Sequence, residues 1–136
     1  MAKDDIRVQP TPAKVDENKK TILIYSPDLN FCFSLSMLFQ DRYNVITTTN
    51  LGLLEKFVAT YSADLVIIDA IPSERILGRL EGLRGVKSDL PIIMLYVYDS
   101  REVELDMAIR KCVDSVFYKP FEIDSVSERI GSLLKG

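Results

Sequence analysis

A carboxylate and an ammonium group each follow a short apolar run of this sequence. Asp69 comes directly after residues 65–68, and Lys119 comes directly after residues 116–118. Four consecutive apolar residues are typical of a buried strand or a buried helix, so a charge placed next to them needs a partner or a function. An aspartate at a strand end can also form a turn or cap the next helix, and this simpler interpretation remains open for Asp69.

Two patterns of apolar residues alternate along the chain, one typical of strands and one typical of helices, and they predict the elements that position these charges. Short apolar or β-branched runs occur at residues 22–25, 45–48, 65–68, 92–95 and 116–118, and segments with helical spacing occur at 31–39, 53–58, 76–83, 103–109 and 123–134. Ser125 and Glu128 could form a capping box at the last helix. Long connections between apolar strands favour a parallel sheet covered by helices on both faces. We therefore predict an α/β fold, a flavodoxin-like (βα)5 three-layer sandwich with strand order 2-1-3-4-5.

In such a sheet, ligands bind beyond the carboxyl ends of the strands, near the point where the strand order reverses. Asp69 and Lys119 are therefore expected to face one crevice. The residues predicted to line the pocket there are Tyr25, Ser26, Pro27, Asp28, Tyr96, Val97 and Pro120.

Composition limits the classes of function. The 136 residues suffice for one domain, and we expect a disordered tail at residues 1–19 followed by a domain at 20–136. A net charge of -3 disfavours nucleic acid as a partner. Histidine is absent, and the two cysteines lie in apolar surroundings, which argues against a zinc site or a Cys-His nucleophile. Neither a secretion signal nor a membrane span is predicted, so we expect a cytoplasmic protein.

The sequence resembles the receiver domain of two-component response regulators over residues 21–134. The resemblance is carried by ILIY at 22–25, DLVIID at 64–69, SDLPIIML at 88–95 and the Lys-Pro-Phe triplet that begins at Lys119. It implies that Asp69 occupies the phosphoacceptor position and that Lys119 pairs with phosphoryl oxygens. In this family an acidic pair after the first strand holds Mg²⁺, and a Thr or Ser after the fourth strand binds the phosphoryl group.

Several family positions are replaced, which suggests a degenerate, pseudo-receiver variant. Ser26 and Pro27 stand where the acidic pair is expected, and Asp28 is better placed to cap the first helix. Because Mg²⁺ requires near-octahedral oxygen ligation, we expect no cofactor and no metal site, with Asp69 and Asp28 as the only candidate ligands. Mg²⁺ is expected only if the domain is phosphorylated.

Three further replacements affect phosphorylation and switching. Tyr96 stands at the Thr or Ser position, and we expect its ring to fill the phosphoryl space or its hydroxyl to reach Asp69 or Lys119. Val116 replaces the aromatic residue that switches rotamer in the family, and Pro72 follows Asp69 one position earlier than usual. Without metal, Asp69 and Lys119 would form a structural ion pair.

Two functions fit these residues. The first is a regulatory module that binds a histidine kinase or an output protein, or forms a homodimer, through residues 103–109, 116–118 and 123–134, with weak or absent phosphorylation. The second is a functional phosphoacceptor in a phosphorelay, phosphorylated on Asp69 by a histidine kinase. Flavin mononucleotide binding and enzymatic turnover both lack the residues they require. The sequence is compatible with a stand-alone protein or with a piece of a longer one.

Overall fold

The computed structural model describes residues 15–135 and contains a five-stranded parallel sheet between two layers of helices. The strands are β1 (Thr21–Tyr25), β2 (Asn44–Thr48), β3 (Leu65–Asp69), β4 (Ile92–Tyr96) and β5 (Ser115–Tyr118). They lie in the order β2-β1-β3-β4-β5, which confirms the predicted topology. Every residue of the first four strands is buried, as the near-continuous apolar runs predicted.

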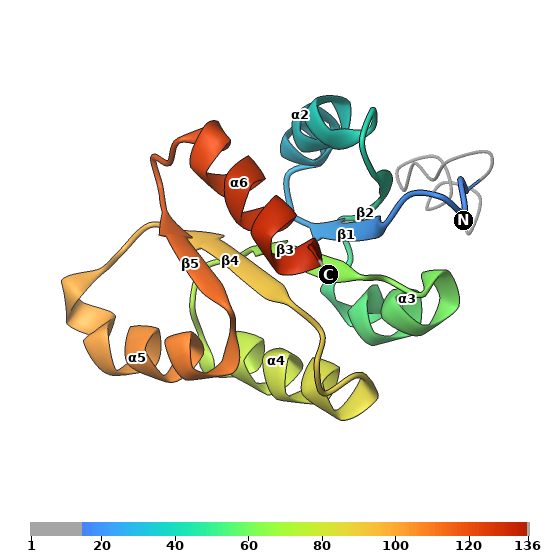
Figure 1. The fold of residues 1–136 in the computed structure, drawn as a ribbon. Helices are drawn as coiled ribbons and strands as arrows, with labels where there is room; N and C mark the ends of the chain where they lie inside the picture. The colour runs from blue at the N-terminus through green and yellow to red at the C-terminus, as the bar shows by residue number, and fades with distance from the viewer. Residues whose placement is uncertain (1–14, 136) are drawn as a thin grey trace.

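Five α-helices cover the two faces of the sheet (Figure 1). They are α2 (Leu29–Phe39), α3 (Leu54–Tyr61), α4 (Glu74–Val86), α5 (Val103–Cys112) and α6 (Ile123–Leu134), and short 3₁₀ helices η1 (Leu51–Leu53) and η2 (Ser100–Glu102) precede α3 and α5. Helices α2 and α6 pack on one face, and α3, α4 and α5 pack on the other. Each face has its own apolar core, so the sheet is buried on both sides.

Polar side chains set several helix boundaries. The Asp28 carboxylate accepts hydrogen bonds from the first turn of α2, and Ser73 caps α4 by accepting from the Ile76 amide at 3.1 Å. The predicted capping box is wrong: α6 begins at Ile123, and Ser125 already lies inside its first turn. Helical spacing of apolar residues therefore located α6 better than the capping motif did.

A turn at residues 16–19 precedes β1 and is tied to the sheet by Asn44. The buried Asn44 amide donates to the carbonyls of Asp16 and Lys19, at 2.8 and 3.1 Å, and its Oδ1 accepts from the Asp16 amide at 3.0 Å. The last residues of the predicted tail thus contact the domain, while residues 1–14 lie outside the described part of the chain.

Candidate functional site

Asp69 is the last residue of β3 and lies at the carboxyl edge of the sheet. Its neighbours across the sheet are β1 and β4, and it is in register with Leu95. Only 8% of its surface is exposed, so its charge must be compensated by nearby groups. The topology therefore places Asp69 where the sequence predicted it.

Both carboxylate oxygens of Asp69 are engaged. The Ser26 hydroxyl donates to Oδ2 at 2.7 Å, and the Lys119 ammonium forms an ion pair and hydrogen bond with Oδ1. Lys119 follows β5, and its Nζ also lies 5.1 Å from the centroid of the Phe31 ring. Asp69, Ser26 and Lys119 thus form a compact polar cluster contributed by three strand ends.

The donor set around this cluster does not fit Mg²⁺. The Asp28 carboxylate faces helix α2, where Oδ1 accepts from the amides of Asn30 and Phe31 at 2.9 and 3.4 Å. The Ser26 hydroxyl donates its hydrogen bond to Asp69 and accepts one from the Asp28 amide at 3.0 Å. Pro27 has no side-chain oxygen that could bind a metal. Within residues 15–135 no three His, Cys, Asp or Glu side chains are grouped as a metal site would require.

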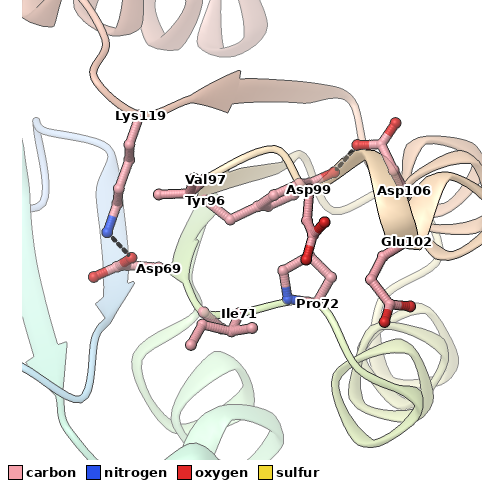
Figure 2. Close-up of a pocket in the computed structure, with 10 residues that line it drawn as sticks. Asp69, Ile71, Pro72, Tyr96, Val97, Asp99, Glu102, Asp106 and Lys119 are labelled. Atoms are coloured by element: carbon pink, nitrogen blue, oxygen red, sulfur yellow. Dashed lines mark hydrogen bonds and ion pairs between the residues drawn. The ribbon is translucent and has the colours of Figure 1, made fainter.

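A pocket of about 280 Å³ opens beside Asp69. Figure 2 shows Asp69 and Lys119 on one side of it and acidic residues near α5 on the other. Tyr96 and Val97 line it as predicted. The other residues predicted to line it do not: Tyr25, Ser26, Pro27, Asp28 and Pro120 are not part of its wall. The pocket instead extends from β3 towards α5.

The orientation expected for Tyr96 is wrong. Its ring is 2% exposed, and its hydroxyl donates to Asp106 Oδ1 at 2.6 Å, away from Asp69 and Lys119 (Figure 2). The physical reason is that both oxygens of Asp69 already accept hydrogen bonds, whereas Asp106 offers an acceptor above the end of β4. Tyr96 therefore forms part of the wall and leaves the pocket open.

Asp106 is the centre of a second polar cluster, formed by Tyr96, Asp106, Arg110 and Tyr118 and called here the α5 lock. Tyr118 donates to Asp106 Oδ1 at 2.9 Å and accepts from Arg110 Nη2 at 2.6 Å, and Arg110 Nε lies 3.3 Å from Asp106 Oδ2. The two tyrosine rings are in edge contact at 5.7 Å between centroids. The lock joins α5 to the carboxyl ends of β4 and β5.

The pKa of Asp106 lies below its ordinary value. Burial raises the pKa of this carboxyl, but hydrogen bonds from Tyr96 and Tyr118, together with Arg110, lower it by more. Burial raises the pKa of Tyr96 well above its usual range, and the hydrogen bond to Asp106 raises it further. A carboxyl with a depressed folded pKa stabilises the fold above its unfolded pKa of about 3.9 and loses that contribution as pH falls through the folded value.

This shift predicts a pH dependence of stability. We expect the free energy of unfolding to fall as the pH is lowered below about 4, because the unfolded chain then takes up a proton on Asp106 that the folded carboxyl, with its lower pKa, binds less readily. The fall should be less steep in Asp106→Asn, which does not titrate. Urea unfolding followed by circular dichroism at each pH measures both slopes, and equal slopes would show that Asp106 makes no such contribution.

Sequence reasoning did not identify the α5 lock. Asp106 falls within the predicted helical segment 103–109 and Arg110 directly follows it, and their spacing of four residues is that of a helical ion pair. The register of the sheet supplies the other signal, since Tyr96 lies opposite Tyr118. That pairing follows only once strand order and register are known.

The comparisons with known proteins agree on the fold. Neither a protein-family model nor a curated protein matches the sequence. The sheet order and the helices on both faces are those of the receiver domains of two-component response regulators, a CheY-like, flavodoxin-type fold. Within residues 15–135 no helix has the length and apolar character needed to cross a membrane.

Three solved structures illustrate this similarity. A CheY-like receiver domain protein from Methanospirillum hungatei is 21% identical with a TM-score of 0.75, and 85% of this chain covers 94% of that one. A Francisella response regulator receiver domain is 22% identical with a TM-score of 0.72, and the match covers 86% of this chain and 98% of that one. A pilus assembly-related protein from Burkholderia pseudomallei is 22% identical with a TM-score of 0.71, and the match covers 90% of this chain and 95% of that one.

Proposed function

We propose that this chain is a regulatory protein-interaction module of two-component signalling, a pseudo-receiver whose output does not depend on phosphorylation of Asp69. One observation carries the proposal: both oxygens of Asp69 are held by Ser26 and Lys119, while Asp28, the other candidate metal ligand, caps α2. Phosphoryl transfer to Asp69 would require breaking this cluster without a cation to stabilise the developing charge. The domain then works without Mg²⁺ and without catalytic turnover.

The partner surface is proposed to lie on α5, β5 and α6. On α5, Val103 and Met107 are 43% and 54% exposed, and Tyr98 beside the end of β4 is 42% exposed. Exposed large apolar residues grouped with charges are typical of protein-binding surfaces. The candidate partners are a histidine kinase, an output protein or a second copy of the chain. The negative net charge disfavours nucleic acid as a partner.

Incubation with Mg²⁺ and acetyl phosphate tests this proposal. We expect intact-mass spectrometry to show no phosphoryl adduct, because the donor set does not hold the metal that the transfer requires. Mg²⁺ with beryllofluoride should likewise leave the amide spectrum unchanged. An adduct that forms on the wild-type protein and disappears in Asp69→Asn would overturn the proposal.

The open pocket supports the alternative function, a phosphoacceptor domain phosphorylated on Asp69 by a histidine kinase. Because Tyr96 turns towards Asp106, the space beside Asp69 and Lys119 stays free. Under this alternative Lys119 would move from the carboxylate to the phosphoryl oxygens. The same acetyl phosphate experiment separates the two functions, since only the alternative yields an adduct.

A further inference from the structure

Helix α2 has no charged residue. Its sequence, from Leu29 to Phe39, is LNFCFSLSMLF, whereas each of the other four α-helices within residues 15–135 has both acidic and basic residues. A helix at the surface normally has a charged or polar side opposite its buried stripe, and a helix that is apolar on all sides is normally buried. The composition of α2 is closer to that of a buried helix.

The side of α2 that faces away from the sheet is exposed all the same. The buried residues of the helix are Cys32, Leu35 and Phe39. With 3.6 residues per turn, Met37 lies opposite them, and Phe33 and Leu38 lie on either side of Met37. Met37 is 71% exposed, Leu38 53% and Phe33 38%. These three residues are called here the α2 face, and apolar side chains grouped in this way are typical of a contact surface.

Within residues 15–135, no element covers the α2 face. Helix α2 packs on β2, the strand at the edge of the sheet, and Figure 1 shows α6 as the other helix of the same layer. Arg42, just after α2, joins the two helices by donating to the Ser127 hydroxyl at 2.9 Å. The outer side of α2 is thus open to another molecule.

A second copy of the chain is the partner that fits an uncharged face. In a two-fold contact the same surface meets itself, so a charge at its centre meets a like charge from the other copy. Like charges facing each other across an interface oppose association, and the α2 face brings none. Met107 on α5, by contrast, lies beside the charged side chains of Glu104 and Lys111.

The charges at the two ends of α2 favour an antiparallel arrangement. Asp28 caps the amino end. At the carboxyl end lie Arg42, which is exposed, and Lys19, whose Nζ is 3.5 Å from the Gln40 carbonyl oxygen, and these two cations outnumber Asp41. A two-fold axis through the middle of α2 brings the acidic end of one copy beside the basic end of the other, and it also opposes the two helix dipoles.

We propose that the α2 face joins two copies of this chain in a two-fold dimer, with the two α2 helices crossing antiparallel. The inference goes beyond the proposed function, because it assigns a second surface and leaves α5, β5 and α6 available to another signalling protein. A contact made by one pair of helices buries less than the about 1,200 Å² at which stable complexes begin. Association is therefore weak, with a dissociation constant on the order of 100 μM.

Sedimentation equilibrium of the full chain, at concentrations up to about 1 mM, tests the proposal. We expect a monomer–dimer equilibrium, and Met37→Glu should raise its dissociation constant at least about tenfold, because a charge then lies at the contact. Leu38→Lys, which changes the net charge in the opposite direction, should weaken the dimer as well. The matched control is Met107→Glu on α5, an equally flexible and exposed side chain, which should change the constant less than about twofold.

A second measurement locates the contact without any substitution. Dilution of the ¹⁵N-labelled full chain should shift the amide signals of α2 and leave those of α5 in place. All three substitutions replace exposed side chains, so the circular dichroism of each variant should match that of the wild-type protein.

Three results would overturn the proposal. The first is a wild-type chain that stays monomeric over the whole concentration range. The second is a dimer that survives Met37→Glu and is lost in Met107→Glu, which would place the contact on α5. The third is a monomer in which a soluble paramagnetic agent fails to broaden the Met37 methyl signal, which would identify residues 1–14 of the same chain as the occupant of the α2 face.

These outcomes are separate from the phosphorylation experiment. A phosphoryl adduct on Asp69 overturns the proposed function and leaves the dimer to be judged by sedimentation. A monomeric chain that forms no adduct overturns the α2 dimer alone.

Discussion

Asp106→Ala is expected to lower the free energy of unfolding by about 3 kcal/mol, because it leaves the buried Tyr96 hydroxyl and the half-buried Tyr118 hydroxyl without their shared acceptor. Arg110 contributes less to this loss, since its side chain is 46% exposed and can turn to water. Urea unfolding at neutral pH measures the difference. Amide hydrogen exchange should accelerate in α5 more than in α2, because the lock fastens only α5 to the strands.

Two matched variants make the Asp106 prediction specific. Asp106→Asn keeps an acceptor oxygen and should lower stability by about 1 kcal/mol. Glu104→Ala removes an exposed carboxylate from the same helix and should change stability by less than about 0.5 kcal/mol. If Asp106→Ala unfolded as the Glu104 variant does, the α5 lock would contribute nothing to stability.

Lys119→Met is expected to lower the free energy of unfolding by about 2 kcal/mol, because the Asp69 charge then remains in the cleft with Ser26 as its main partner. The value lies below that of a deeply buried pair because the Lys119 side chain is 32% exposed, against 11% for Asp69. Asp69→Asn should have a smaller effect, about 1 kcal/mol or less, since Lys119 can reach water and the Asn amide oxygen can still accept from Ser26.

The order of these two effects is the decisive measurement. Thermal and urea unfolding of the two variants, with Lys111→Met as an exposed control on α5, give the comparison. A larger effect for Asp69→Asn than for Lys119→Met would mean that the carboxylate is not the buried partner of this pair.

The fold could be predicted because most strands and helices are marked by patterns of apolar residues within their own short segments of the sequence. Apolar or β-branched runs of three or four residues and helical spacing located the five strands and five α-helices of residues 15–135, and the long connections between strands indicated a parallel sheet. Element ends were less well defined: β3 and β4 each continue one residue further, to Asp69 and Tyr96. Their register with the neighbouring strand extends them, and register is not visible in a single sequence.

The site could be predicted only in part. Asp69 and Lys119 follow from the rule that carboxyl ends of parallel strands meet at one edge, and the cap formed by Asp28 follows from its position before a helix. The direction of Tyr96 depends on a competition between acceptors on different elements, Asp69 and Asp106. Such a competition is decided by tertiary geometry, and neither residue type nor spacing reveals it.

The hydrogen bonds of Asn44 also show that the folded unit includes residues ahead of β1. Its amide, 7% exposed, has acceptors at Asp16 and Lys19, residues that belong to no helix or strand. A chain shortened to begin at Lys20 would leave that amide with the 3.4 Å contact to the Thr21 hydroxyl as its remaining hydrogen bond. The smallest fragment able to fold as the intact protein does should therefore retain Asp16, four positions ahead of the limit suggested by hydrophobicity alone.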